Sequence, residues 1–185
     1  KDSQLRMLFA ICNPTISNEA QVALALRILC GFGIDEIATA LLSNKATINK
    51  RLLRAKQTLR TNQISFSFPE LEALGDRLSN VLSVLYLLFN EGYYSATSLK
   101  IISKDLCLEA MRLLYMLLDN TSTCLPETNA LMALFCFHAS RFDARISNSG
   151  ELILYNDQDK EKWDGDLIQK GEEYLHYSAE GEHLS

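Results

Sequence analysis

Apolar residues recur at helical spacing along most of this chain, and the runs are separated by short polar segments. In the first third, Val22, Leu26 and Leu29 occupy positions i, i+4 and i+7, which share one face of a helix. Ser17 precedes this run, and its hydroxyl can accept a hydrogen bond from a first-turn N–H group, as an N-cap does. The glycines of "GFG" (31–33) end the run. The pattern predicts a helix between Ser17 and this segment.

Two further helices are expected in close succession. The segment "IDEIATALL" (34–42) predicts a short helix, and "SNK" (43–45) predicts a tight turn. The next helix is expected over about residues 46–60, and its buried stripe is formed by Ile48, Leu52, Ala55 and Leu59. Most of its remaining surface is cationic. Two short helices joined by about four residues, the second basic and facing outward, form a helix-turn-helix.

The same periodicity continues after a polar loop. Apolar stripes predict helices over residues 76–90, after an N-cap at Ser103, and over residues 163–177. Pro126 is expected in the first turn of another helix. The alternation in "ELILY" (151–155) predicts a short strand or an extended segment. Helical pairs of about this length suggest a tetratricopeptide-like stack, although no 34-residue repeat can be aligned.

Charge divides the chain into a basic first part and an acidic second part. Residues 1–62 carry nine Lys or Arg and four Asp or Glu, whereas residues 63–185 carry nine and nineteen, which gives net charges of +5 and −10. Residues 43–60 contain six Lys or Arg and no acidic residue. Because a solvated face usually mixes both signs, this stretch predicts a surface that binds a polyanion. An ordinary solvated basic face is the alternative.

The candidates for DNA binding are polar and basic residues of the predicted turn and second helix. Such side chains contact base edges and phosphates when a recognition helix enters the major groove. Residues near the start of the helix are expected to read bases, whereas Arg54 and Lys56 are expected to hold the backbone. The full set of candidates is Asn44, Lys45, Thr47, Asn49, Lys50, Arg51, Arg54 and Lys56.

The segment "EAQVALALRILCGFGIDEIATALLSNKATINKRLLRAKQTLR" (19–60) resembles region 4 of the sigma-70 family of RNA polymerase sigma factors. The similarity is strongest to the extracytoplasmic-function (ECF) group, whose pattern includes "EIAxxL", a turn and "TIxxRLxRAKxxLR". The resemblance implies a winged-helix-like helix-turn-helix that recognises the promoter −35 element. It also implies that the chain contacts the RNA polymerase core and acts in the cytoplasm during transcription initiation.

The second part resembles the C-terminal domain of one ECF subgroup, on the segments "FNEGYYS", "DLCLEAMRLL", "PETNALMALFCFHASRFDAR" and "LYNDQDKEKWD". Members of that subgroup are often encoded beside small DGPF/YCII-related proteins, so the resemblance implies such a protein as a partner. It also implies a regulatory or docking role for the extension. The last motif commonly reads "DQDR", and Lys160 replaces the Arg here, which weakens any bidentate contact. The family places region 2 ahead of region 4, so the chain is expected to be the C-terminal portion of a longer sigma factor.

A dense acidic stretch forms the second candidate site. EF-hand spacing counted from Asp157 would require Gly at the sixth position and Glu at the twelfth, where the chain has Lys162 and Ile168. A solvated loop that leads into a capped helix and a docking surface therefore stay open, with catalysis or metal binding as lesser alternatives. The docking candidates are Asp157, Gln158, Asp159, Trp163 and Asp164.

Motifs, cysteine spacing and hydropathy limit the classes of protein to which the chain can belong. No nucleophile elbow, P-loop or dinucleotide motif occurs, so no enzyme activity, cofactor or metal is predicted. The five scattered cysteines form no CxxC pair and are expected to be reduced, mostly buried thiols of a cytoplasmic protein. His138 is expected to be a half-buried histidine with satisfied hydrogen bonds. No apolar run approaches the roughly 18–20 residues of a membrane span.

The sequence therefore predicts an all-α chain with three parts. Residues 1–62 form a helix-turn-helix DNA-binding domain, residues 63–75 a linker and residues 76–185 a helical, tetratricopeptide-like extension. Two rival functions stay open. A helix-turn-helix regulator with a ligand-sensing extension would favour a dimer on a palindromic operator. A helical protein-interaction module with incidental basic charge would bind no DNA in a salt-dependent way.

Overall fold

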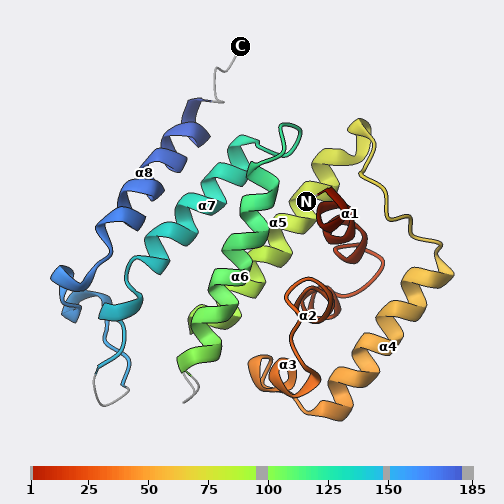
Figure 1. Cartoon of the computed structure of the whole chain (residues 1–185), viewed down its shortest axis with the longest axis horizontal. Helices are drawn as coiled ribbons and strands as arrows, with labels where there is room; N and C mark the ends of the chain where they lie inside the picture. The colour runs from red at the N-terminus through yellow and green to blue at the C-terminus, as the bar shows by residue number, and fades with distance from the viewer. Residues whose placement is uncertain (1, 95–99, 148–150, 181–185) are drawn as a thin grey trace. The chain divides into compact units, whose positions relative to one another are not determined.

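The computed structural model describes residues 2–94, 100–147 and 151–180. In these ranges the chain is helical, and its only β-type pairing is a single antiparallel bridge between Ile146 and Leu152. The predicted all-α class is therefore confirmed (Figure 1). Besides three short 3₁₀ turns, the helices are α1 (Asp2–Ile11), α2 (Asn18–Ile28), α3 (Ile34–Ala40), α4 (Lys45–Thr61), α5 (Leu71–Tyr94), α6 (Lys100–Leu118), α7 (Pro126–Ala139) and α8 (Gly165–Glu180).

The contacts within the chain define two compact units, Lys1–Glu91 and Gly92–Ser185. In the first unit, α2 packs against α1, α3 and α4. Small side chains such as Ala23 and Ala25 let these neighbours approach closely, and both are fully buried. The predicted N-cap is confirmed, because the Ser17 hydroxyl accepts a hydrogen bond from the Ala20 N–H group. Gly31 follows the helix with φ +76°, a left-handed conformation that suits glycine.

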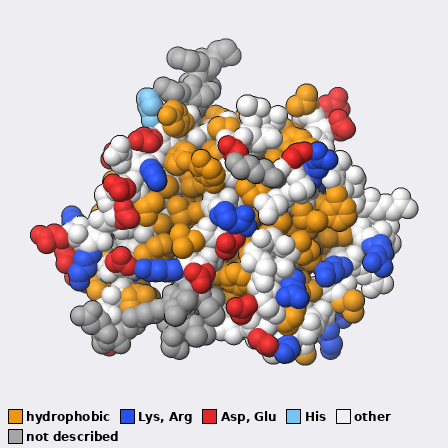
Figure 2. Space-filling view, in the orientation of Figure 1, with side chains coloured by type: hydrophobic (Ala, Val, Ile, Leu, Met, Phe, Trp, Pro, Cys, Tyr) orange, Lys and Arg blue, Asp and Glu red, His pale blue; other side chains and the backbone are white. Residues whose placement is uncertain are grey.

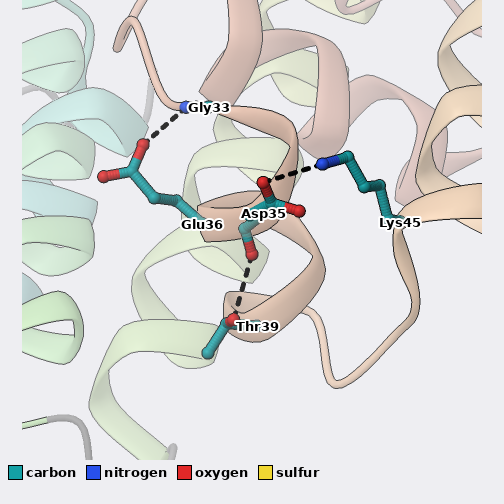
Figure 3. A network of polar contacts seen from close by, with 5 residues as sticks. All are labelled: Gly33, Asp35, Glu36, Thr39 and Lys45. Atoms are coloured by element: carbon teal, nitrogen blue, oxygen red, sulfur yellow. Dashed lines mark hydrogen bonds and ion pairs between the residues drawn. The ribbon is translucent and has the colours of Figure 1, made fainter.

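The short helix α3 and the longer helix α4 form a pair that is joined by a four-residue turn. Glu36 caps the start of α3, because its carboxylate accepts a hydrogen bond from the Gly33 N–H group at 2.5 Å (Figure 3). The predicted apolar stripe of α4 is buried at Ile48, Leu52 and Ala55, whereas Leu59 is half-buried. This stripe packs against α2 and α3. The opposite side of α4 is left at the surface of the unit.

The first unit extends well past residue 62, where the sequence analysis ended the DNA-binding domain. Helix α5 begins at Leu71, five residues before the predicted start. Arg77 of α5 donates a hydrogen bond to the Phe9 carbonyl, and Phe68 packs edge-on against the Phe9 ring at 5.2 Å. Asn80 donates to the Cys12 carbonyl at 2.8 Å. These bonds join the first half of α5 to α1 and to the α1–α2 loop.

The second unit is built on α6, α7 and α8. Pro126 lies in the first turn of α7, as predicted. Helices α7 and α8 run antiparallel side by side (Figure 1), and Gly171 of α8 packs against the ring of Phe137. Because Gly171 has no Cβ, the two helices approach each other closely at this point.

Two predicted helix bounds need correction, and one open alternative is decided. Helix α6 begins at Lys100, so Ser103 lies inside the helix and does not cap it. The "ELILY" segment is not a strand among the described residues: Leu152 forms one isolated bridge, and Tyr155 begins a 3₁₀ turn, so the alternative of an extended segment holds for its first part. Helix α8 begins at Gly165 and ends at Glu180, a shift of two to three residues from the predicted bounds.

Candidate nucleic-acid interface

The basic surface of α4 is the first feature of the interface. Helix α4 carries six Lys or Arg residues and no acidic residue. All eight DNA-binding candidates except Arg51 are exposed, and Arg51 is half-buried. Lys and Arg side chains lie along the surface that α4 forms (Figure 2). The buried stripe thus fixes the helix while its cations face solvent.

Two candidates at the start of α4 have local partners. The Asn44 side-chain oxygen accepts a hydrogen bond from the Thr47 N–H group at 2.8 Å, so Asn44 is the N-cap of α4. Lys45 forms an ion pair with Asp35 of α3, with 2.9 Å between Nζ and Oδ2 (Figure 3). Both side chains remain largely exposed. Asn44 therefore positions the helix, and the charge of Lys45 is balanced by α3.

A groove opens between α4 and the start of α2. It encloses about 490 Å³. One wall is formed by the α1–α2 loop and the first turn of α2, and the other by α4. The residues that line it are Thr15, Ile16, Ser17, Ala20, Thr47, Lys50, Arg51, Arg54, Ala55 and Thr58. Three of the six cations of α4 therefore border one concave surface, which is called the basic groove below.

The carboxylate of Glu19 interacts electrostatically with Arg51 of this groove. The pKa of Glu19 is lowered, first by a hydrogen bond with the Ser17 side chain, then by its own backbone N–H group and by the Arg51 charge. Glu19 is therefore ionised at neutral pH. Its negative charge offsets part of the positive potential near Arg51.

The eight candidates do not form one continuous site. Thr47, Lys50, Arg51 and Arg54 line the basic groove, whereas Asn49 and Lys56 do not. At 100° per residue, Asn49 and Lys56 project from the side of α4 opposite the groove, together with the exposed Leu53. Thr15 and the later α4 residue Thr58 also line the groove and were not among the candidates. Helical spacing places Thr58 with Thr47, Arg51 and Arg54, but no sequence signal places the α1–α2 loop opposite them.

The acidic stretch of the second unit has a structural role at several positions. Asp159 accepts a hydrogen bond from the Glu161 N–H group and caps a 3₁₀ turn. The Asp164 carboxylate accepts one from the Leu167 N–H group at 3.0 Å, at the start of α8. Such bonds satisfy backbone donors that helix ends leave free. This geometry supports the interpretation of a loop that leads into a capped helix.

The remaining docking candidates differ in exposure. Gln158 is buried, and its amide donates to the Ile153 carbonyl at 3.1 Å. Trp163 is half-buried and its ring lies 5.7 Å from that of Tyr155, whereas Asp157 is exposed. Within the part of the chain that the structure describes, no group of three or more His, Cys, Asp or Glu is placed to hold a metal ion.

His138 is half-buried, as predicted, and Arg141 lies 2.9 Å from its Nδ1 atom. Burial lowers the pKa of His138 to about 4, and the charges of Arg141 and Arg145 act in the same direction. The imidazole is therefore neutral at pH 7. The edge of Tyr93 packs on it, with ring centroids 4.6 Å apart.

Comparison with known proteins identifies the family of this chain. The model of a family of unknown function, DUF6596, matches residues 77–179, which is more than half of the chain. This chain belongs to the DUF6596 family. An uncharacterized protein of Rhizobium meliloti (strain 1021) is 38% identical over 168 residues, which is 91% of this chain and 40% of that protein. The chain thus spans about two fifths of the length of this curated relative. No solved structure gives a significant match.

The DUF6596 match begins inside α5, so it does not cover the basic groove. It does include Arg77 and Asn80, which bond to the α1–α2 loop and its neighbour α1 in the first unit. The match continues through α6, α7 and most of α8. None of the described helices is long and apolar enough to cross a membrane.

Proposed function

We propose that this chain is the DNA-binding C-terminal portion of an ECF-type sigma factor. In this proposal α3 and α4 form the helix-turn-helix of region 4, which binds the promoter −35 element and contacts the RNA polymerase core in the cytoplasm. The observation that carries the proposal is the charge of α4, whose surface carries six cations and no carboxylate. The resemblance of residues 19–60 to region 4 supports it independently.

The geometry of the α3–α4 pair supports the same role. A four-residue turn joins the helices, and the apolar stripe of α4 is buried against α2 and α3. This packing leaves the basic side free for a duplex. Because an α-helix fits the major groove of B-DNA, exposed Asn, Lys and Arg side chains of α4 can reach base edges and phosphates there.

The DUF6596 region is proposed to regulate the DNA-binding unit or to dock another protein. A DGPF/YCII-related protein is one proposed partner, and another region of the sigma factor is a second. The proposal for a docking role rests on the acidic charge of residues 63–185, which carry a net charge of −10. No catalytic role is proposed for this region.

Binding to short duplexes tests the DNA role. Each phosphate that a protein neutralises contributes about −0.9 to the slope of log K against log salt concentration. If Lys50, Arg51 and Arg54 each contact one phosphate, binding should weaken by about 40-fold between 50 and 200 mM salt. The measurement is fluorescence anisotropy of the full chain with labelled duplexes that carry candidate −35 sequences, alone and with the RNA polymerase core.

A lysine of the second unit provides a control that separates this role from a general charge effect. Arg51→Gln combined with Arg54→Gln should abolish most of the salt-dependent binding, whereas Lys170→Gln, on α8 of the second unit, should leave it unchanged. A full chain that binds no duplex at 50 mM salt, with or without polymerase, would contradict the proposal. Equal losses in the Lys170 variant would mean that net charge alone governs binding.

A further inference from the structure

The basic groove gathers positive charge that its surroundings neutralise only in part, through Glu19 near Arg51. Among the residues that the structure describes, no carboxylate lies within ion-pair distance of Lys50, Arg51 or Arg54. Lys45 of the same helix is instead paired with Asp35. Lys50 and Arg54 are four residues apart on one helix face, where like charges repel each other. An anion bound in the groove would remove this repulsion.

Hydrogen-bond donors stand beside these cations. Thr47 and Thr58, whose hydroxyls can donate hydrogen bonds, also line the groove. Thr47 lies one helical turn before Arg51, and Thr58 lies one turn after Arg54. Ser17 and Ala20 place the first turn of α2 in the facing wall. The N–H groups of a first turn and the helix dipole favour negative charge there. Cations, hydroxyls and a helix start around one concavity match the chemistry of a phosphate group.

We propose that the basic groove is a phosphate site that holds the sugar–phosphate backbone of duplex DNA. This inference rests on the proposed DNA-binding function and deepens it. Lys50, Arg51 and Arg54 supply the positive charge, and Thr47 and Thr58 supply hydroxyl donors. This assignment differs from the sequence-based expectation that residues near the start of α4 read bases, because Lys50 and Arg51 are here assigned to the DNA backbone. Base reading is left to the opposite side of the helix, where Asn49 projects.

Phosphate contacts and base contacts have different signatures in binding experiments. Loss of a phosphate contact weakens binding equally on all sequences, whereas loss of a base contact weakens the preferred sequence more. The first experiment therefore compares the full chain with Lys50→Gln plus Arg54→Gln, on a −35-like duplex and on a scrambled duplex of equal length. The affinities are measured at 50 and 200 mM salt.

The expected result is a loss of the same size on both duplexes. The salt slope should fall by about 1.8, so the weakening between 50 and 200 mM salt becomes about 12-fold smaller than in the parent chain. Thr58→Val should weaken binding to both duplexes while leaving the slope unchanged, because it removes a neutral donor. Asn49→Ala should weaken only the −35-like duplex. A double variant that loses the sequence preference but keeps the salt slope would overturn the inference.

Inorganic phosphate serves as a second probe that needs no DNA. A ligand that binds only the folded chain raises its thermal midpoint. The full chain should show a higher Tm in phosphate than in chloride at equal ionic strength and pH 7. The increase should shrink in the double variant and persist in Lys170→Gln. The increase left in the double variant measures the general stabilising effect of phosphate salts.

The two experiments distinguish failure of the groove from failure of the proposed function. If the parent chain binds duplexes and the double variant keeps both the slope and the phosphate effect, the groove inference is wrong and DNA binding stands. If phosphate raises Tm through Lys50 and Arg54 but no duplex binds, the groove takes small phosphate compounds and the DNA backbone assignment is wrong.

Discussion

The side chain of Asn80 donates a hydrogen bond to Gln21 Oε1 at 2.9 Å, and this bond joins α5 to α2. Gln21 is 1% exposed and in turn donates to the Asn13 and Ile16 carbonyls. The network satisfies backbone acceptors of the α1–α2 loop, which forms one wall of the basic groove. A helix outside the predicted DNA-binding domain therefore holds that wall in place.

A fragment that ends at residue 62 should fail to fold stably. It lacks Arg77 and Asn80, and so leaves buried carbonyls and the Gln21 amide oxygen without their partners. A fragment of residues 1–91 keeps them and should unfold cooperatively on heating. Circular dichroism of the two fragments checks this. Equal thermal midpoints would show that α5 adds nothing to the first unit.

Asn80→Ala in the full chain tests the same network with one change. The substitution removes two hydrogen bonds and leaves a buried acceptor on Gln21, so we expect a loss of about 1–3 kcal/mol in the free energy of unfolding. Ser79→Ala, at the neighbouring exposed position of α5, is the control and should change stability by less than about 0.5 kcal/mol. Urea titration of both variants measures the difference.

Asp35→Asn should strengthen DNA binding. It releases Lys45 from its ion pair and removes a negative charge beside the basic side of α4. Because the pair is exposed, its loss should cost at most about 1 kcal/mol of stability. Glu172→Gln on α8 removes one negative charge in the second unit and is the matched control. Equal gains in both variants, measured by anisotropy at 50 mM salt, would trace the effect to net charge.

Stability should fall as the pH is lowered from about 6.5 to about 4, and His138 should account for part of this fall. The folded chain holds the pKa of His138 at about 4, below the ordinary value of 6.5. Between these values the unfolded chain binds a proton that the folded chain does not, which favours unfolding. His138→Gln should flatten this part of the profile. Urea unfolding at pH 7, 5.5 and 4.5 checks it, and an unchanged slope would contradict the assignment.

Gly171→Ala should destabilise the second unit. A Cβ atom built on Gly171 would lie 2.7 Å from Cε1 of Phe137, so either the Phe137 ring or the two helices would have to shift. Overpacking of this kind typically costs about 1–3 kcal/mol. Gly75→Ala is the matched control, because a Cβ there meets nothing within 4 Å and α5 should gain about 0.5–1 kcal/mol. A stabilised Gly171 variant would contradict this prediction and show that the Phe137 ring makes room at little cost.

Much of the fold was predictable because it depends on neighbours in the sequence. Helical periodicity identified the apolar stripe of α4. The N-cap at Ser17 and the first-turn position of Pro126 each follow from the properties of one residue type. Local signals failed to place a helix start where several adjacent residues could begin the helix. Ser103 has the chemistry of an N-cap, but α6 begins at Lys100, since a helix can start at several adjacent residues at similar cost.

The sequence by itself determined the all-α class, the order of the helices from α2 to α8 and the basic character of α4, because each follows from composition or from spacing within one helix. Helix α1 was not predicted. Only the tertiary structure decided that Thr15 and Ser17 face Arg51 and Arg54, and that Asn80 bonds to Gln21. Periodicity shows which face of a helix is buried, but it carries no information about which distant segment covers that face. These contacts join positions more than 30 residues apart, and they arise when the helices pack.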